Sequence, residues 1–352
     1  MIRAKIIGAS GYGGVGITEL LTKHPEAEPA ALVDIENVGK PISELYPHLD
    51  GFCDIPLVAP DDPVAQADAD VVFMATPDGV GMKLAGEALT SGAKVIDYSG
   101  DFRFNTPDSY AEYASRMGLD TQHAAPDLLP ESVYGLAELH RDHINTDTRV
   151  VGNPGCFAVS CILGLAPALK QGLVEPRGLI CDCKTGVSGA GRKPHAAFHF
   201  PARYEQMNAY KLAGHQHVCE IERELGLQAG EDVIVTFTAQ VIPVCRGIMS
   251  TLYGTLTRPL TEADVLDLYK SFYADDTFVR VYGSTAAVGS MHVRGTNYCN
   301  LVISVDERAG KLRIVSYIDN LVKGQAGSAL QNMNLLFGLP EGTGLSIPGV
   351  YP

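Results

Sequence analysis

Short apolar segments alternate with helix-spaced segments through about the first third of the chain. We expect buried strands at residues 5–7, 30–33, 71–75 and 94–98. Between them, residues 17–21 and 80–89 place apolar side chains at the spacing of a helix. Strands that alternate with helices predict a parallel sheet with helices on both of its faces.

The second half of the chain has a different pattern. Longer strand-like segments follow one another, and one clear helix, residues 262–273, interrupts them. The expected strands are residues 233–244, 248–256, 300–305 and 312–318. Strands that follow strands predict a mixed or antiparallel sheet. A last helix is expected at residues 327–337.

These patterns predict an α/β fold in two parts. The first is a Rossmann-type domain with a parallel sheet, and the second is an α+β domain with a mixed, largely antiparallel sheet. The change falls near residues 150–155. A chain of 352 residues is long enough to bury two cores.

A glycine-rich turn, Gly8 to Gly16, separates the first expected strand from the first helix. Glycines there allow a tight turn, let backbone amides approach a pyrophosphate, and direct it to the helix N-terminus. The alternative is a tight turn that binds no ligand. The position of the turn inside the alternating pattern favours a dinucleotide site.

The second expected strand ends at Asp34, about 20 residues beyond the glycine turn. An acid at this place accepts a hydrogen bond from the ribose 2′-hydroxyl of NAD and repels the 2′-phosphate of NADP. The nearest base downstream is Lys40. Local chemistry therefore favours NAD, with a plain turn or cap aspartate as the alternative.

One cysteine lies where a thiolate would be stabilised. Cys156 follows an expected strand, residues 149–151, and precedes helix-spaced apolar residues. The amides and dipole of a helix N-terminus lower the pKa of a thiol, and the same amides can stabilise an oxyanion. Cys156 is therefore either a nucleophile or a buried structural thiol. Beside a nicotinamide, such a nucleophile would form a thioester that hydride reduces to an aldehyde.

Two further segments carry candidate chemistry. His215 and His217 precede a helix with Glu220 and Glu222, and either imidazole could serve as general acid and base. The alternative is a pair of solvated histidines at an exposed helix start. The segment 186–193 combines glycines with a hydroxyl and two cations, as an anion site requires, or forms a flexible surface loop.

A third cation, Arg103, follows the expected strand at 94–98, at the end where α/β folds bind ligands. We consider it a second phosphate candidate, with a salt bridge to Asp101 or another acid as the alternative. The formal net charge of −14 disfavours nucleic acid and anionic membranes as partners, so an anionic substrate would need a locally basic pocket.

The cysteines and apolar stretches bear on the compartment. The eight cysteines show no metal-binding spacing, and unpaired thiols in a reducing cytoplasm are expected for all but Cys156. No apolar stretch reads as a signal peptide or a membrane span. We therefore expect a cytoplasmic protein without a metal.

The motifs, taken together, resemble one enzyme family. In chain order they are G-A-S-G-Y-G-G, S-G-D-F-R, G-N-P-G-C, G-V-S-G-A-G-R, Y-K-L-A-G-H-Q-H, R-G-T-N-Y-C-N and D-N-L-V-K-G-Q-A-G-S-A-L-Q-N-M-N. The series is similar to that of the N-acetyl-gamma-glutamyl-phosphate reductases, relatives of aspartate-semialdehyde dehydrogenase. The likeness runs from Gly8 to about Gly338.

The resemblance implies that N-acetyl-glutamyl 5-phosphate is reduced by NADPH to N-acetyl-glutamate 5-semialdehyde, with phosphate released, in arginine biosynthesis. It implies that Cys156 is the nucleophile and that His217, with His215 as the alternate, supplies the acid/base. The implied substrate ligands are Arg103, Asn153, Ser188 and Arg192. The implied cofactor contacts are Gly8, Ser10, Gly11, Tyr12, Gly13, Gly14, Asp34, Thr76, Pro77 and Asn320.

The resemblance also implies a homodimer or homotetramer. In that family the C-terminal helix belongs with the cofactor domain. We therefore predict one domain at 1–152 plus 325–352 and a second at 153–324. Family members commonly carry serine in place of Asp34 and a base in place of Ile35, and this departure leaves NAD(H) open beside NADP(H). Other acyl phosphates, carrier-bound aminoadipyl or aspartyl phosphate, are alternative substrates. A Cys-His hydrolase and an inactive nucleotide sensor are alternatives from other classes.

Overall fold

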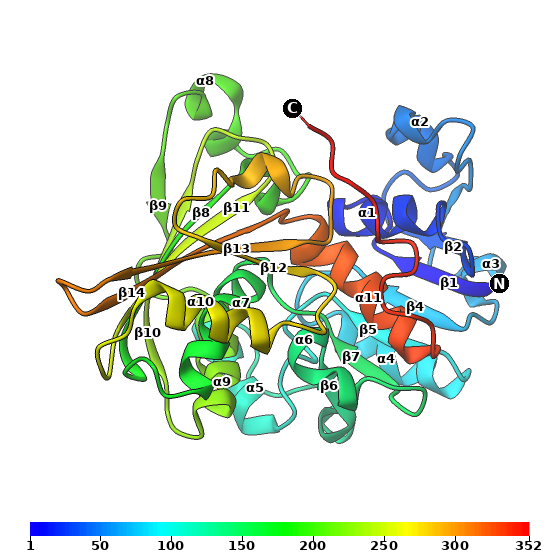
Figure 1. The fold of residues 1–352 in the computed structure, drawn as a ribbon. Coiled ribbons are helices and arrows are strands. Elements are labelled where there is room, and N and C mark those ends of the chain that lie inside the picture. Colours follow the sequence, from blue (N-terminus) through cyan, green and yellow to red (C-terminus); the bar gives the residue numbers. More distant parts are fainter. Residues whose placement is uncertain (352) are drawn as a thin grey trace. The chain divides into compact units, whose positions relative to one another are not determined.

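A computed structural model, in which residues 1–351 are described, contains two seven-stranded sheets (Figure 1). One unit consists of Met1–Gly155 and Gln325–Ile347, and the other of Cys156–Gly324 and the residues from Pro348. We expected all residues from 325 onward in the first part. The end of the chain contacts the second unit instead, because the Val350 amide donates to the Arg294 carbonyl oxygen at 3.3 Å.

The sheet of the first unit is parallel throughout, as predicted, in the order β3-β2-β1-β4-β5-β7-β6. Its strands are β1 (Ile2–Ile7), β2 (Ala27–Val33), β3 (Leu57–Val58), β4 (Val71–Met74), β5 (Lys94–Asp97), β6 (Ser132–Tyr134) and β7 (Val150–Gly152). The strand order reverses between β1 and β4. Such switch points are where doubly wound sheets bind ligands, at the carboxyl ends of the strands.

The helices of the first unit bury apolar faces against this sheet. In α1, Ile17 and Leu21 are buried, as the helical spacing predicted. The last helix packs beside α1 in the same unit and carries buried amides, of which Asn334 bonds the His24 ring at 3.0 Å. The helices are α1 (Tyr12–Leu21), α2 (Ile42–Leu45), α3 (Pro63–Gln66), α4 (Gly81–Thr90), α5 (Pro107–Met117), α6 (Ala137–His140) and α11 (Gly327–Leu336).

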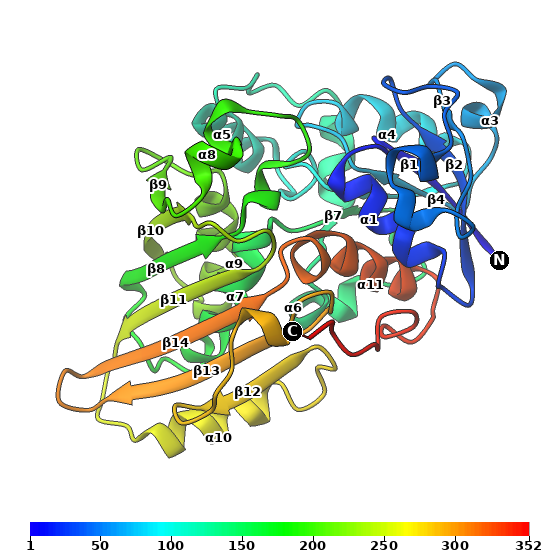
Figure 2. The ribbon, with the colours of Figure 1, turned by 90° about the horizontal axis from the view of Figure 1, so that it is seen from above.

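The sheet of the second unit is mixed, as predicted, in the order β12-β13-β14-β11-β8-β10-β9 (Figure 2). The β8–β10 and β12–β13 pairs are parallel, and the other neighbours are antiparallel. The strands are β8 (Arg177–Thr185), β9 (Asn208–Tyr210), β10 (Ile234–Val241), β11 (Ile248–Thr255), β12 (Val279–Gly283), β13 (Cys299–Asp306) and β14 (Lys311–Ile318).

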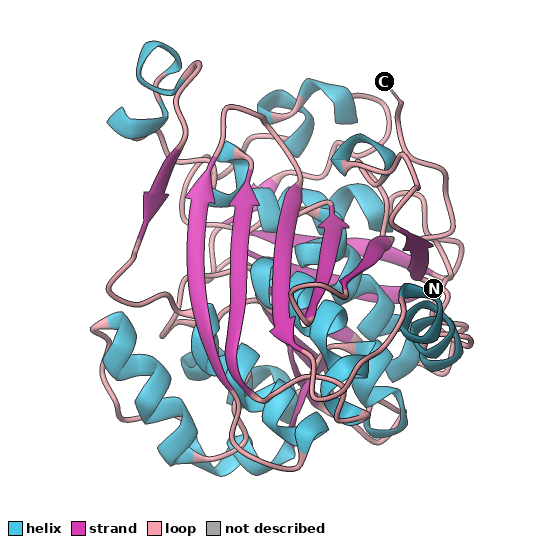
Figure 3. Ribbon diagram, turned by 60° about the vertical axis from the view of Figure 1, so that its left-hand side comes forward, coloured by secondary structure: helices cyan, strands magenta, loops and turns pink. Residues whose placement is uncertain are grey.

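Helices cover one face of this second sheet and leave the other open. The helices are α7 (Cys156–Lys170), α8 (Phe200–Arg203), α9 (His217–Ala229) and α10 (Glu262–Phe272). Alternate residues of β11, such as Leu252, are buried toward α7, where Gly164 leaves room for the Leu252 side chain. The residues between them, such as Tyr253, point to the opposite, half-exposed face. Figure 3 shows the long strands in front and helices behind them.

All eight cysteines are free thiols, and Cys156 and Cys245 are the two that are not buried. Cys181 and Cys183 share the buried face of β8, as their spacing predicted. Cys161 is fully buried in α7, with its sulfur 3.5 Å from that of Cys183. Burial raises the pKa of both of these thiols, so they are inert core groups.

Candidate active site

The glycine turn follows β1 and approaches the backbone after β4. Gly8 has φ +81°, and a Cβ there would lie 2.4 Å from the Ala75 carbonyl oxygen. A Cβ on Gly14 would lie 2.3 Å from the Gly8 carbonyl oxygen. At Gly11, by contrast, the nearest atom to an added Cβ is 3.5 Å away. Packing within the protein thus explains Gly8 and Gly14, whereas Gly11 borders open space.

Helix α1 begins at Tyr12, earlier than the turn-length estimate of Gly16. Gly13 and Gly14 therefore belong to its first turn, and Ser10 is buried just before it. The N-cap, Gly11, has no side chain to bond the first amides, so these amides are available to an anion. The geometry is that of a pyrophosphate site at a helix N-terminus.

Asp34, which follows β2, is hydrogen-bonded to the glycine turn. Its Oδ2 accepts a hydrogen bond from the Ser10 amide at 2.8 Å, and its Oδ1 accepts from the Ile35 and Glu36 amides at 2.8 and 3.0 Å. The side chain is 8% exposed. Asp34 therefore joins the end of β2 to the glycine turn, and a carboxylate with about four acceptor positions can still accept one more donor.

The loop after β4 carries a buried hydroxyl group that lacks a hydrogen-bond partner and lies beside the glycine turn. Thr76 Oγ1 is buried and has no hydrogen-bond partner in the described chain. Its amide nitrogen lies 3.6 Å from the position of a Cβ on Gly8, and Pro77 is exposed next to it. The orphaned hydroxyl, the open space at Gly11 and the free helix amides all fit a nicotinamide dinucleotide.

Two residues predicted to bind substrate, Arg103 and Asn153, make hydrogen bonds around the turn before Cys156. Arg103 is 7% exposed, and it donates to the carbonyl oxygens of Asn153 at 2.8 Å and Tyr98 at 2.7 Å. The Asn153 side chain donates to the Gln325 carbonyl oxygen at 3.0 Å and accepts from Asn332 at 3.3 Å. Both side chains thus position the turn that leads to the cysteine.

A pair of buried carboxylates adjoins Arg103. Asp97 and Asp101 are both fully buried, and Asp101 accepts from the Met82 amide at 3.0 Å. Burial, followed by the charge of Asp101, raises the pKa of Asp97 to about 8, although Arg103 opposes this shift. The pair therefore carries less negative charge at neutral pH than two exposed aspartates would.

In the second unit, Cys156 is the first residue of α7, as the sequence predicted, and it is partly exposed. Helix amides and dipole favour the thiolate at this place. A Cβ on Gly324 would lie 2.7 Å from that of Cys156, so only glycine leaves the sulfur this space. The charge of Cys156 also contributes, after burial, to a raised pKa of Tyr210.

The two histidines lie beside the residue that follows the cysteine. The Phe157 ring is 5.7 Å from the His215 ring and 6.0 Å from the His217 ring, between centroids. The two imidazoles are 4.7 Å apart and are 3% and 7% exposed. The alternative of two solvated histidines is therefore wrong.

The two imidazoles differ in their surroundings. Burial, with Lys211 as a smaller cause, lowers the pKa of His215 to about 3, and its Nδ1 accepts from the His217 amide at 3.2 Å. His215 is therefore a neutral acceptor at the start of α9. His217 Nε2 lies 3.8 Å from a carboxylate oxygen of Glu220, which is 1% exposed. A buried acid at this distance can orient the imidazole and stabilise its charged form.

We expect His215 to make the protein acid-sensitive. In the unfolded chain a histidine protonates near pH 6.5, whereas in the fold His215 resists protonation down to about 3. The stability that neutral His215 contributes is therefore present above pH ~6.5 and is lost as the pH falls below it. The melting temperature of a His215→Asn variant should fall less between pH 7.5 and 4.5 (about three pH units) than that of the natural protein. An exposed-site control, His143→Asn, should follow the natural protein, and equal slopes for all three would contradict the assignment.

Ser188 and Asn320, predicted to contact substrate and cofactor, are bonded to each other. Asn320 donates to Ser188 Oγ at 3.0 Å and accepts from the Gly247 amide at 2.7 Å. Both side chains are buried. The structure thus brings Ser188 and Asn320 together, and Arg192 lies farther along, in an exposed stretch of the same loop.

The sequence reasoning missed Arg246. Its guanidinium pairs with the buried Asp319 at 3.0 Å, and the Asp319 carbonyl oxygen accepts from the amide of Gly324, the glycine against Cys156. The Ser188 amide donates to the carbonyl oxygen of Cys245, the neighbour of Arg246. A partly exposed cation is thereby linked to the cysteine and to Ser188. Its only sequence signal is a cation in a glycine-containing turn between two strands.

Comparisons with known proteins agree with this arrangement. Residues 3–147 match the family described as "Semialdehyde dehydrogenase, NAD binding domain", and residues 156–320 match "Semialdehyde dehydrogenase, dimerisation domain". Aspartate semialdehyde dehydrogenase II from Vibrio cholerae superposes with a TM-score of 0.72 over 96% of this chain and 99% of that one, at 14% identity. An aspartate semialdehyde dehydrogenase with NADP from Candida albicans gives 0.65 over 96% and 98%, at 16% identity.

Two curated relatives are much closer in sequence. The N-acetyl-gamma-glutamyl-phosphate reductase of Pelotomaculum thermopropionicum is 43% identical over 100% of this chain and 99% of its own. That of Symbiobacterium thermophilum is 44% identical over the same shares. The two-domain fold and its glycine turn are those of the semialdehyde dehydrogenases, a class of nicotinamide-dependent oxidoreductases. Within that class, the chain belongs to the N-acetyl-gamma-glutamyl-phosphate reductase family.

None of the helices within residues 1–351 has both the length and the apolar character needed to cross a bilayer. Within the same residues, no three histidine, cysteine or acidic side chains are grouped as metal ligands.

Proposed function

We propose that the chain reduces N-acetyl-glutamyl 5-phosphate to N-acetyl-glutamate 5-semialdehyde with a nicotinamide cofactor, releasing phosphate, in arginine biosynthesis. The observation that carries the proposal is Cys156, partly exposed at the N-terminus of α7 and followed by Phe157, whose ring contacts a buried histidine pair. It is joined to a second unit whose glycine turn fits a dinucleotide. The names of the relatives supply the substrate.

In this mechanism the Cys156 thiolate attacks the acyl carbon, and the carbon–oxygen bond to phosphate breaks to leave a thioester. The amides at the start of α7 stabilise the oxyanion. The nicotinamide, when bound, supplies the hydride that reduces the thioester carbon. Collapse of the resulting oxyanion expels the thiolate and releases the aldehyde.

We assign the proton transfers to His217 and a positioning role to Glu220. A general acid/base works best when its pKa is near the working pH, and a pKa of about 3 leaves His215 unsuited. Glu220 faces His217 at 3.8 Å and favours an imidazole that can carry the thiol proton. His215 then serves by accepting the His217 amide and fixing the start of α9.

For anion recognition we propose Ser188, Arg192 and Arg246 as the groups that meet the phosphate or the substrate carboxylate. Arg246 keeps its guanidinium partly exposed while Asp319 fixes it from behind. Arg103 donates to the Asn153 carbonyl oxygen and Asn153 to that of Gln325, and we propose that both side chains position the turn before Cys156.

For the cofactor we propose NADP(H), as the resemblance to the reductase family implies. We propose that NAD(H) is also accepted, because of Asp34. The Asp34 carboxylate lies at the end of β2, where a 2′-phosphate would meet its charge. We expect Asp34→Ser to raise the ratio of kcat/KM for NADPH to that for NADH by about tenfold or more, because one charge repulsion is removed. The exposed control Asp61→Asn should leave the ratio unchanged. A ratio that stays constant in Asp34→Ser would show that this carboxylate does not face the ribose.

We further propose a homodimer or homotetramer in the cytoplasm. The second unit matches a domain described as a dimerisation domain, and its sheet leaves one face open with Ile180 44% exposed. Eight unpaired thiols suit a reducing compartment. Sedimentation velocity of the purified chain would test the assembly.

A reverse assay tests the function directly. The protein is given N-acetyl-glutamate 5-semialdehyde, phosphate and each oxidised nicotinamide in turn, and reduced cofactor is followed by absorbance. We expect turnover that requires phosphate. Turnover with aspartate semialdehyde or with a carrier-bound aminoadipyl aldehyde instead would show that the corresponding acyl phosphate is the substrate. Absence of nicotinamide binding by calorimetry would favour a Cys-His hydrolase.

A further inference from the structure

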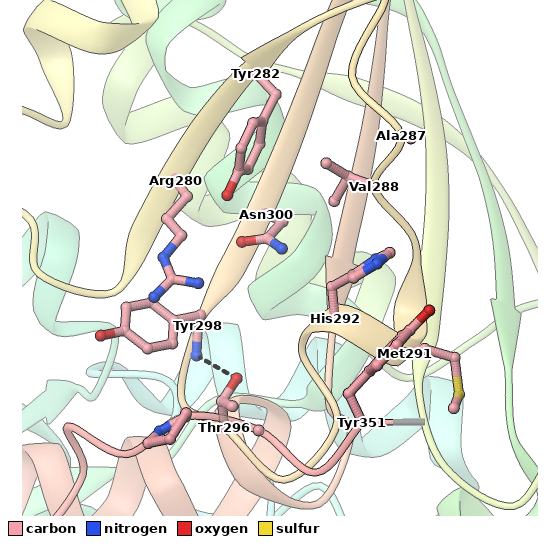
Figure 4. A pocket seen from close by; sticks show the side chains of 12 residues that line it. Arg280, Tyr282, Ala287, Val288, Met291, His292, Thr296, Tyr298, Asn300 and Tyr351 are labelled. Carbon is pink, nitrogen blue, oxygen red and sulfur yellow. Dashed lines mark hydrogen bonds between the residues drawn. The ribbon is translucent and has the colours of Figure 1, made fainter.

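A polar side chain without a partner in the protein marks a place where another molecule can bind. Asn300 is one such residue, because its Oδ1 is buried and has no hydrogen-bond partner within the described residues. It lines a hollow of about 400 Å³ together with Arg280 and Tyr282 (Figure 4). The hollow lies in the unit that matches a dimerisation domain, so we expect a second copy of the chain, rather than a small ligand, to cover it. Gln325, in the first unit, is another such residue.

The side chain of Gln325 lies against the first turn of α1. A Cβ on Gly13 would be 2.9 Å from Gln325 Nε2 and 3.2 Å from the Tyr98 ring. Gly13 is the second residue of α1, and glycine at this position leaves room for an amide group instead of an apolar side chain. The Gln325 amide therefore lies beside the helix N-terminus at which we expect the pyrophosphate.

This amide is unused by the protein itself. Within residues 1–351 the Gln325 side chain makes no hydrogen bond, although it is half-buried. It does not cap α1 either, because that helix has no side-chain cap. A glutamine amide offers two N–H donors without a charge. The glycine turn, Gly8 to Gly16, contains no lysine or arginine, so neutral N–H donors are what this turn and its neighbour offer to a pyrophosphate.

The backbone of Gln325 determines where its side chain lies. The residue belongs to a π-helical turn, Val322–Ala326, which leads into α11. Such single turns are rare and are found frequently at functional sites. The Gln325 carbonyl oxygen accepts a hydrogen bond at 3.0 Å from the side chain of Asn153, three residues before Cys156. One residue thus adjoins both the glycine turn and the turn that leads to the nucleophile.

We propose that Gln325 is a cofactor ligand, and that its side-chain N–H donates to the pyrophosphate of the dinucleotide at the start of α1. The free amides of α1 meet the same group from the end of the helix. A dinucleotide that runs from the glycine turn toward the turn before Cys156 passes this side chain, because Gln325 adjoins both. The inference rests on the proposed function, since it takes the ligand of the glycine turn to be a nicotinamide dinucleotide.

Two substitutions of Gln325, measured by calorimetric titration, test this contact. Gln325→Glu keeps the shape of the side chain but replaces a donor with a negative charge, and we expect the Kd values for NADPH and NADH to rise about a hundredfold. Gln325→Ala only removes the donor, and we expect both Kd values to rise about tenfold. Both cofactors contain the pyrophosphate, so the ratio of their Kd values should stay constant, in contrast to the result expected for Asp34→Ser.

The control and two further measurements separate a ligand from a structural residue. Gln66→Glu adds the same charge at the exposed end of α3 and should bind both cofactors as the natural protein does. The two Gln325 variants should keep the natural melting temperature, because the side chain has no hydrogen bond to lose. Added salt should reduce the loss of affinity in Gln325→Glu more than in Gln325→Ala, because salt screens the repulsion between two negative charges. A structural role predicts neither the larger loss in the variant of unchanged shape nor its dependence on salt.

Other outcomes overturn the proposal. Unchanged Kd values in both Gln325 variants would show that the side chain does not touch the cofactor. Tighter binding by Gln325→Glu than by Gln325→Ala would show that the side chain accepts a hydrogen bond and does not face a phosphate. A lower melting temperature in both variants would show a structural role. If the natural chain binds neither NADPH nor NADH, the proposed function fails too, whereas natural binding that ignores Gln325 refutes this contact alone.

Discussion

Replacing Cys156 with serine is expected to abolish reduction and to leave nicotinamide binding unchanged. A serine hydroxyl at neutral pH is a far weaker nucleophile than a thiolate, and loss of a covalent nucleophile costs at least ~10³-fold in kcat. The helix N-terminus that stabilises a thiolate does little for an alcohol. The glycine turn belongs to the other unit, so the substitution touches none of its contacts. Steady-state kinetics and calorimetric titration with the cofactor measure the two effects.

Cys245 provides the matched control for this experiment. It is the other thiol that is not buried, and it lies one residue from Arg246. We expect Cys245→Ser to retain activity and Cys156 to remain the faster site of alkylation by iodoacetamide at neutral pH, read by mass spectrometry. Turnover by Cys156→Ser within tenfold of the natural protein would exclude a thioester route.

Two glycines of the same turn should respond differently to alanine. At Gly14 an added methyl group would lie 2.3 Å from the Gly8 carbonyl oxygen and 2.6 Å from the Ala9 Cα, and both are backbone atoms that cannot swing away. We expect Gly14→Ala to lower the melting temperature, by an overpacking cost of about 1–3 kcal/mol, and to abolish cofactor binding. Thermal unfolding and calorimetric titration with NADPH report these two quantities.

Gly11→Ala tests the ligand contact itself. Its added methyl group would meet only the Gly8 carbonyl oxygen at 3.5 Å, which is ordinary contact, so the melting temperature should be unchanged. The methyl would nevertheless enter the space at the helix N-terminus, and we expect the Kd for NADPH to rise about tenfold or more. If Gly11→Ala binds the cofactor normally, the pyrophosphate does not approach this face of the turn.

Periodicity alone predicted most of the architecture. Four short apolar segments became neighbouring parallel strands, and the long segments of the second half became β10, β11, β13 and β14. Periodicity failed for β12, whose exposed positions interrupt the apolar pattern. It also placed the start of α1 too late. Gly13 and Gly14, which it assigned to the turn, are helical, and Gly14 is needed because the helix passes close to the Gly8 carbonyl oxygen.

Local sequence could place Cys156 at a helix N-terminus but could not choose between the histidines. That choice depends on burial, and His215 is buried by Phe157 and by Phe237, 4.9 Å away on β10. Arg246 was missed for the same reason. Its connection to Cys156 runs through Asp319 and Gly324, more than 70 residues along the chain, and no motif spans that separation.

The three amides bound by Asp34 have a consequence for how cofactor preference can evolve. In the cofactor site proposed above, Asp34 would meet the ribose while it holds the Ser10, Ile35 and Glu36 amides, so it could not be replaced for one purpose alone. At about 1 kcal/mol for each lost bond, a substitution that admits the 2′-phosphate also loosens the loop that grips the pyrophosphate. Lineages that exchange one dinucleotide for the other must therefore acquire a compensating change in this loop first, or pass through a weaker enzyme.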